Sequence, residues 1–315
     1  MSKYQEIQRA KAIELIEKSK LFDGCKAGGK FMGKERPFVL LDRSYNFHKS
    51  IRKEVEPYFK KNDISWWGGQ RPTPHTLSSQ IACLNHLYPI RNDKNEVLKI
   101  AQIICPEITD VLEIKTDKFQ PAYISFEAIS EVDYLNETES GKPTRGSHCT
   151  SIDALIYAKH KNGKNYILPI EWKYTEHYGN ENKADGKKGK VREGRYKELI
   201  KRSAQLKSEN HKCFYFEPFY QLMRQSLWAE QMIAHRNSEK ISAENFIHTH
   251  IIPRENNNLL GKKYSCSGND METTWRKHLK DQSKYKIISP DELLANIDTK
   301  KYADLKNYLQ KRYWS

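Results

Sequence analysis

Two strand-forming segments joined by an Asn-Gly turn constrain this chain most. Residues 150–160 (TSIDALIYAKH) and 167–176 (ILPIEWKYTE) are rich in β-branched and aromatic residues, and Asn162-Gly163 lies between them. Such a pattern is a strong hairpin signal. A two-residue turn would pair positions that sum to 325 and would mix charged with apolar side chains on both faces. A three-residue loop with a left-handed Gly163 pairs positions that sum to 324 and separates the two kinds of side chain.

This second register predicts one apolar and one charged face. The apolar pairs are Ile152–Trp172, Ala154–Ile170 and Ile156–Leu168. On the other face Asp153 lies opposite Glu171, with facing Cβ atoms about 4.5–5.5 Å apart. Ser151 lies opposite Lys173 on the same face.

The charged face allows two interpretations. Two carboxylates this close repel each other unless a proton or a cation lies between them. Hard divalent cations such as Mg²⁺ prefer oxygen ligands, and a nearby lysine can orient water or stabilise phosphate charge. The face therefore predicts a metal site at Asp153 and Glu171 with Lys173 beside it. The alternative is an ordinary solvent-exposed sheet face on which Lys173 forms a salt bridge with one carboxylate.

The remaining segments predict an α/β fold around one mixed sheet. Residues 3–20 form an amphipathic helix with one apolar face, consisting of Ile7, Ala10, Ile13 and Ile16. Further helices are expected after Thr76 and at 96–105, 191–208 and 218–235, with a strong start at Ser289-Pro290. Strands are expected within 122–135, 149–175 and 246–252, and at the aromatic residues 214–216. This order of elements indicates a mixed sheet flanked by helices.

The charge of the chain favours a polyanionic partner. The 315 residues contain 54 Lys and Arg against 40 Asp and Glu, which gives a net charge of +14. Nucleic acid is the usual partner of such a chain, although a soluble protein can be basic without one. No segment approaches the roughly 20 apolar residues of a membrane helix, and the first residues from Met1 lack a signal peptide's apolar stretch. The six scattered cysteines contain no CxxC pair and predict buried thiols rather than a zinc site or a disulfide framework.

The hairpin resembles the catalytic hairpin of the PD-(D/E)XK nuclease superfamily. Asp153 is followed, after seventeen residues, by Glu171-Trp172-Lys173, although Ile152 stands where the motif's name has proline. The resemblance implies a restriction-endonuclease-like mixed sheet flanked by helices. It also implies that Asp153, Glu171 and the main-chain carbonyl of Trp172 bind Mg²⁺, while Lys173 positions or activates the attacking water.

Other segments are similar to a group of uncharacterised, predicted restriction-endonuclease-like proteins. These segments are Ser78-Ser79-Gln80, Arg145-Gly146, residues 150–153, Glu171 to Glu176 and Tyr220 to Gln225. The likeness covers roughly residues 75–235. It implies a nuclease core at 76–260, a helical N-terminal extension at 1–75 and a C-terminal helical segment at 261–315.

Several further residues are candidates for the same site. The superfamily often adds an acidic residue, for which Glu127 is the first candidate and Glu131 and Glu137 are alternatives; each could instead cap an element or face solvent. Gln221, Arg224 and Gln225, at a helix start, are candidates for contacts with the phosphate or the carboxylates, and Gln80 is a further one. His248 and His250 share one strand face, which we expect to be exposed rather than metal-binding because no third ligand lies nearby.

Two segments are candidates for contacts with nucleic acid. Residues 183–202 contain nine Lys and Arg against three Asp and Glu, and their glycines Gly186, Gly189 and Gly194 predict a mobile loop that leads into a helix. The candidates for phosphate contacts there are Lys187, Lys188, Lys190 and Arg192, unless the segment is only a solvated loop. In the turn-rich residues 62–76, Trp66 and Trp67 either cover the core or stack on bases.

These observations predict a Mg²⁺-dependent endodeoxyribonuclease of the restriction type that acts on double-stranded DNA. We expect it to lie in the cytoplasm of a bacterial cell, in association with the nucleoid, and a palindromic target would suit a homodimer. The alternatives are a DNA repair or mobile-element nuclease of the same superfamily, an RNA-directed nuclease, or a DNA-binding module without catalysis. No motif identifies a recognition sequence.

Overall fold

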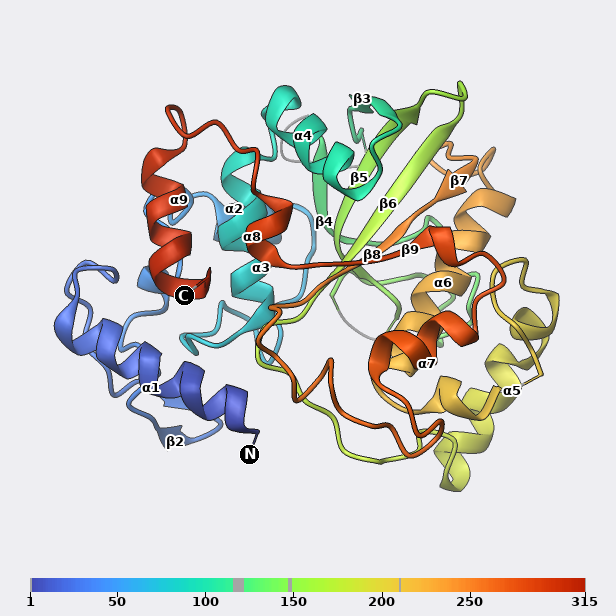
Figure 1. Ribbon diagram of the computed structural model, residues 1–315, viewed down its shortest axis with the longest axis horizontal. Coiled ribbons are helices and arrows are strands. Elements are labelled where there is room, and N and C mark those ends of the chain that lie inside the picture. The colour runs from blue at the N-terminus through green and yellow to red at the C-terminus, as the bar shows by residue number, and fades with distance from the viewer. Residues whose placement is uncertain (1, 116–121, 147–148, 210, 315) are drawn as a thin grey trace.

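The predicted hairpin is the centre of a mixed sheet that has seven strands in the described part of the chain (Figure 1). The structure is a computed structural model and describes residues 2–115, 122–146, 149–209 and 211–314. The strands are β3 (Ile108–Leu112), β4 (Ile124–Ala128), β5 (Ile152–His160), β6 (Asn165–Trp172), β7 (Asn245–Phe246), β8 (His248–Ile251) and β9 (Tyr285–Ile288). Their main order is β3-β5-β6-β8-β9, and β4 and β7 pair with β5 and β6. The strands β3, β4 and β6 pair with β5 in antiparallel orientation. The strands β7 and β8 pair with β6 in parallel, and β9 pairs with β8 in parallel.

Helices cover both faces of this sheet, which makes three layers (Figure 1). They are α1 (Lys3–Lys18), α2 (Val55–Lys61), α3 (Ser79–Leu87), α4 (Lys94–Ile104), α5 (Gly186–Arg202), α6 (Phe219–Ala234), α7 (Met271–Lys277), α8 (Pro290–Leu293) and α9 (Ala303–Leu309). A first hydrophobic core packs α2, α3, α4, α8 and α9 against one face, and a second packs α5, α6 and α7 against the other. A separate two-stranded ribbon consists of β1 (Lys30–Phe31) and β2 (Lys34–Glu35). The predicted α/β fold with a mixed sheet and flanking helices is confirmed.

The register predicted for the hairpin is confirmed in its central part. Ala154 pairs with Ile170 and Ile156 with Leu168, as a sum of 324 requires. Gly163 has a φ of +83° in the loop. Because helices lie on both faces of the sheet, nearly the whole of β6 is buried, and this explains its continuous apolar sequence.

The strand is distorted where the charged residues begin. Ile152 packs in the second core, whereas the predicted apolar face would place it with Ala154 in the first. On the neighbouring strand, Glu127 has a φ of +48°, in the left-handed region that few non-glycine residues adopt. The regular alternation therefore ends at Asp153, where the charged residues of three strands meet.

The predicted helices are close to their observed positions. The buried face of α1, however, differs from the predicted one. Ile7 is exposed, and the buried residues are instead Tyr4, Gln8 and Ala12. Gln8 can be buried because its Oε1 accepts a hydrogen bond from the hydroxyl of Tyr174 (2.8 Å). The prediction based on isoleucine spacing was therefore wrong for Ile7 and Ala10, which are exposed, whereas Ile13 packs, partly buried, against the first core.

Three other predictions about local structure were wrong. Gly186, Gly189 and Gly194 lie within α5 rather than in a loop, because the packing of Tyr196 and Ile200 into the second core outweighs the low helix propensity of glycine. The aromatic residues 214–216 do not form a strand, since a 3₁₀ helix runs from His211 to Tyr215.

The third concerns the cysteines. Cys213 and Cys266 form a disulfide, with their Cα atoms 5.3 Å apart, whereas Cys25, Cys83, Cys105 and Cys149 are free. The partners lie 53 residues apart in the sequence, so spacing alone gave no indication of the pair.

Residues distant in the sequence share the first core. It contains side chains between positions 12 and 66 together with side chains between positions 293 and 313. The buried guanidinium of Arg312 donates hydrogen bonds to the main-chain carbonyls of Asn46 (2.7 Å) and Thr76 (3.1 Å). The domain boundaries proposed from the sequence stay predictions, and their outer ends at Met1 and Ser315 lie outside the described residues. Within the described residues, no helix is both long and apolar enough to span a membrane.

Candidate active site

Three carboxylates from neighbouring strands line one cavity. Asp153 lies at the start of β5, Glu171 near the end of β6, and Glu127 in β4. Because β4 and β6 flank β5, these strands bring the three side chains together. The cavity has a volume of about 530 Å³ and also contains Lys173. The structure therefore brings Glu127, Asp153, Glu171 and Lys173 together around one cavity.

Lys173 is buried within this cluster rather than on a solvent-exposed face. Its Nζ lies 2.5 Å from Oε1 of Glu171 and 2.7 Å from Oε1 of Gln221. Lys173 is 5% exposed and Glu171 is 3% exposed. Burial acts to lower the pKa of Lys173, but Glu171, Tyr178, Glu176 and Asp153 together outweigh burial, and the pKa is raised. The ammonium therefore stays charged and is held in one place.

The single positive charge of Lys173 does not balance the three carboxyl groups Asp153, Glu127 and Glu171. Burial, followed by the charges of Glu171 and Glu127, raises the pKa of Asp153 well above its ordinary value. Burial and the charge of Glu171 also raise the pKa of Glu127. Raised pKa values of this kind show that the cluster needs a proton or another positive charge to be stable.

Hydrogen bonds fix each carboxylate. The main-chain N–H of Trp172 donates to Oδ2 of Asp153 (2.7 Å), and the amide of Gln225 donates to Oε2 of Glu171. Glu127 accepts from Nε2 of Gln80 and from Oγ of Ser151, both at 2.8 Å. Ser151, which was expected to lie opposite Lys173, therefore donates its hydrogen bond to Glu127. The glutamines that the sequence singled out all contact the cluster: Gln80, Gln221 and Gln225.

Arg145 supports the unusual backbone at Glu127. Its guanidinium donates to the main-chain carbonyls of Glu127 (3.0 Å) and Phe126 and to Oγ of Ser125 (3.1 Å). A left-handed residue without glycine's freedom costs about 1–3 kcal/mol and persists only where its surroundings fix it. Sequence reasoning quoted Arg145 as part of a likeness but assigned it no role, because contacts with main-chain atoms leave no pattern of side chains.

The two alternative acidic candidates lie outside the cluster. Glu137 is buried and binds Arg224 (2.7 Å) and the hydroxyl of Tyr196 (2.6 Å). Glu131 is exposed and forms an ion pair with Lys240 (2.8 Å). Arg224 therefore lines the cavity but is held by Glu137 rather than by the three clustered carboxylates.

The basic segment lies beside a second cavity, of about 480 Å³. Arg192, Lys183 and Arg195 line it, together with Arg224, which also lines the first cavity. Lys187, Lys188 and Lys190 are exposed along α5. Cationic side chains therefore line the second cavity together with Glu137 and Glu217, and Arg224 is shared with the first cavity.

His248 and His250 are buried, so the prediction of an exposed face was wrong. The strand β8 that carries them lies inside the sheet between β6 and β9, and His250 pairs with Glu171. Burial lowers the pKa of His248 to about 4 and that of His250 well below its ordinary value. Both rings are therefore uncharged near neutral pH.

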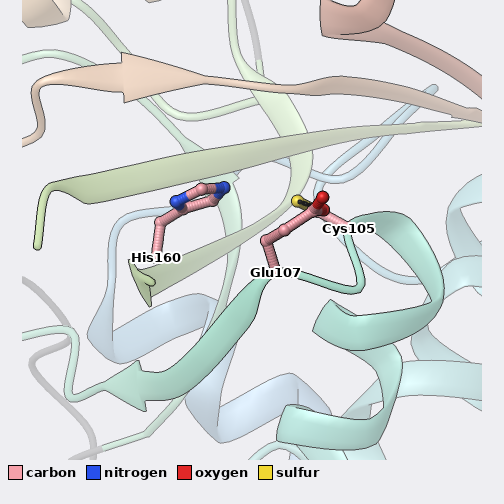
Figure 2. Close-up of side chains that lie close together, drawn as sticks. All are labelled: Cys105, Glu107 and His160. Carbon is pink, nitrogen blue, oxygen red and sulfur yellow. Dashed lines mark hydrogen bonds between the residues drawn. The ribbon is translucent and has the colours of Figure 1, made fainter. Parts of the chain in front are cut away.

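A second group of potential ligands lies at the other end of the hairpin. Figure 2 shows Cys105, Glu107 and His160 close together, and one donor atom from each lies within 4.8 Å of the others. The main-chain N–H of Asn162 donates to Nδ1 of His160 (3.1 Å), so the neutral ring carries its proton on Nε2. The thiol of Cys105 donates to Glu107 (3.3 Å). Hydrogen bonds of the protein thus occupy one side-chain atom of each of these three residues.

The fold and the cluster define a class: an α/β protein with a buried acid–lysine site where the central strands of a mixed sheet meet. The chain belongs to the family described as Restriction Endonuclease associating with ARP, whose model matches residues 21–314. It is thus a restriction-endonuclease-like protein, and its family indicates a nuclease-like role. No curated protein and no solved structure matches the chain.

Proposed function

We propose that this protein is a Mg²⁺-dependent endodeoxyribonuclease of the PD-(D/E)XK type that hydrolyses phosphodiester bonds in double-stranded DNA. The observation that carries the proposal is the cluster of Glu127, Asp153, Glu171 and Lys173 in one cavity. A binding module would gain nothing from several carboxylates directed at a phosphate, because like charges repel. A metal ion reverses that repulsion, and a lysine beside it serves hydrolysis.

The side chains present fit a magnesium ion. All three acidic residues offer hard oxygen ligands. Burial and the charges of neighbouring carboxylates raise the pKa values of Asp153 and Glu127, and a bound cation would offset both effects. Asp153 and Glu171 would be the principal ligands, and Glu127 and the main-chain carbonyl of Trp172 would be further ones. The bound ion would lower the pKa of a water molecule and stabilise negative charge on the phosphate.

The remaining residues of the site would orient the reacting groups. Lys173, held by Glu171 and Gln221, presents a fixed ammonium for the attacking water or for a phosphate oxygen. Gln225 fixes the second oxygen of Glu171, and Gln80 fixes Glu127. Each of these side chains already has its orientation in the protein, which lowers the cost of assembling the reactive geometry.

The cations on the α5 side would bind the DNA backbone. Arg192 and Lys183 line the cavity next to the acidic cluster, and the lysines of α5 continue outward from it. Phosphate contacts of this kind position a duplex without reading its sequence. A homodimer would suit a palindromic target, and the oligomeric state in solution would test that part of the proposal.

A cleavage assay tests the function directly. Plasmid and phage DNA are incubated with the wild type or with Glu171→Gln, in Mg²⁺ or in EDTA. Discrete fragments that require Mg²⁺ and are absent with the variant would support a restriction-type nuclease, whereas a Mg²⁺-dependent smear would favour a repair or mobile-element role. Glu107→Gln, at the far end of the hairpin, is the matched control and should cleave as the wild type does. DNA binding without cleavage by the wild type would contradict the proposal and favour a binding module.

A further inference from the structure

Two aromatic side chains, the exposed Trp67 and the half-buried Phe31, line the acidic cavity. The sequence left open whether Trp66 and Trp67 cover the core or contact bases, and the structure separates the two residues. Trp66 is buried and stacks on Phe59, with ring centroids 3.7 Å apart. Trp67 is 54% exposed and stacks on Phe31 (5.8 Å, interplanar angle 20°). Both Trp67 and Phe31 line the cavity that contains the carboxylates.

The protein holds this pair in place from both sides. Phe31 packs edge-on against His75, with centroids 4.6 Å apart. The main-chain N–H of Trp67 donates to Oε1 of Gln80 (3.2 Å), and Nε2 of the same side chain donates to Glu127 (2.8 Å). A single glutamine therefore connects the main chain at Trp67 to the acidic cluster. The buried ring of Trp66 fixes the adjoining residue, so Trp67 has little freedom to turn inward.

We propose that Trp67 and Phe31 form a stacking surface for one nucleobase of the substrate, next to the phosphate at the acidic cluster. The inference rests on the proposed nuclease function. A nucleotide whose phosphate lies at the carboxylates carries its base into the same cavity, where the chain offers aromatic faces. Stacking on an aromatic side chain stabilises a bound base by about 1–3 kcal/mol and does not depend on which base it is.

This surface also specifies the state of the substrate. A base inside a regular duplex stacks on its neighbours and has no free face for an indole. A base on Trp67 must therefore be unpaired already or leave the helix on binding, and this costs least at a bulge or a mismatch. We infer that the site prefers DNA with an unpaired nucleotide next to the cleaved bond over a regular duplex.

Binding measurements test the inference. The probes are a short fluorescein-labelled duplex with one central unpaired thymidine and the same duplex fully paired, both in Ca²⁺ without Mg²⁺ to suppress cleavage. We expect the wild type to prefer the first probe, and we expect Trp67→Ala to lose about ten- to a hundredfold in affinity for it. Trp67→Phe should retain most of that affinity, and the dependence on salt should be unchanged because no phosphate contact is lost.

The controls distinguish the inference from the function on which it rests. Met32→Ala removes an apolar side chain that is 78% exposed next to Phe31, and it should bind both probes as the wild type does. Unfolding curves show whether Trp67→Ala folds, and Trp67→Phe provides a second test if it does not. Equal affinity of the wild type and Trp67→Ala for the unpaired probe would overturn the stacking surface alone. No binding of either probe by the wild type would overturn the nuclease proposal and the stacking surface together.

Discussion

At the scale of single residues, the site is defined by a lysine that is buried among acids. The ammonium of Lys173 neutralises part of the charge of Glu171. It also donates to Oε1 of Gln221, which helps to fix its position. Burial, together with the charges of the neighbouring carboxylates, raises the pKa values of Asp153 and Glu127. The Mg²⁺ ion of the proposed function would add positive charge to this cluster.

Replacing the lysine should affect the reaction more than binding. We expect Lys173→Met to lower the cleavage rate by about a hundredfold or more while DNA affinity changes little, because the ammonium acts on charge that develops during the reaction. Single-turnover cleavage and fluorescence anisotropy measure the two effects separately. Lys159→Met, an exposed lysine on the same hairpin, should leave both unchanged. Parallel loss of binding and cleavage would show that Lys173 serves only to attract DNA.

The acidic cluster should also make the stability of the metal-free protein depend on pH. The folded-state pKa of Asp153 lies above 3.8, so the folded protein holds its proton more tightly than the unfolded chain does. Stability in EDTA should therefore fall as the pH rises above about 4, and Mg²⁺ should restore more of it at higher pH, where its ligands are deprotonated. Lys173 does not contribute in this range, because its raised pKa matters only at alkaline pH.

Thermal unfolding across pH 4–8, with and without Mg²⁺, measures this effect. Asp153→Asn should flatten the slope in EDTA and raise the midpoint near neutral pH, while it lowers the gain from Mg²⁺. A variant less stable than the wild type in EDTA at neutral pH would contradict the assignment of repulsion to this carboxyl group.

The sequence could locate the central residues of this site but not their supports. Asp153, Glu171 and Lys173 follow from the register of the hairpin, which the alternation of apolar side chains determines. Arg145 could not be found in this way, since its partners are mainly main-chain carbonyls whose positions depend on a distorted strand.

At the scale of secondary structure elements, the sequence pattern predicted the position of an element where apolar residues determine its packing. The hairpin and the helices α3, α4 and α6 lie near their predicted positions because their apolar residues determine their packing. The pattern misled where a contact from elsewhere compensates for a poor local signal. Gln8 is buried through a hydrogen bond from Tyr174, and the glycine-rich start of α5 is helical because later residues of α5 are packed. His248 and His250 are buried because β8 lies inside the sheet and both rings pack against Tyr285 of β9.

Gly146 and Gly163 have similar left-handed backbones but different surroundings. Comparing them distinguishes the cost of backbone strain from the cost of a steric clash. Gly146 has a φ of +78°, and a Cβ there would lie 2.6 Å from the carbonyl oxygen of Ser65. Gly163 has a φ of +83° with nothing within 4 Å of the same position. We expect Gly163→Ala to cost about 1 kcal/mol of unfolding free energy from the left-handed backbone alone, whereas Gly146→Ala should cost more because Ser65 must also move.

Urea unfolding of both variants measures the difference. The main-chain N–H of Ser65 donates to the carbonyl of Arg145 (3.0 Å), and the side chain of Arg145 donates to the carbonyl of Glu127. A shift at Ser65 should therefore reach the backbone around Glu127 and reduce Mg²⁺ affinity in Gly146→Ala only. Equal losses in the two variants would show that the segment at Ser65 adapts freely.

At the scale of the whole molecule, the net charge of +14 should determine how strongly DNA is bound. If the lysines of α5 contact phosphates, each one should contribute about 0.9 to the slope of log affinity against log salt concentration. The combined variant Lys187→Gln, Lys188→Gln and Lys190→Gln should therefore bind more weakly and with a shallower slope, as anisotropy titrations at several salt concentrations would reveal. Lys300→Gln removes an exposed lysine near α9 and should leave the slope unchanged. An unchanged slope in the combined variant would place the DNA on another face.

A ribosome releases this chain in order, and Arg312 emerges 236 residues after Thr76, whose carbonyl it binds. Thr76 lies between His75 and Leu77, which line the acidic cavity. Until Arg312 is available, this wall of the cavity lacks one of its buried anchors, although the hairpin with its carboxylates has been synthesised long before. A nascent or prematurely terminated chain would then carry the chemical groups of a nuclease without their final arrangement. The same buried arginine would in this way make the final arrangement of the cavity wall depend on residues far along the chain.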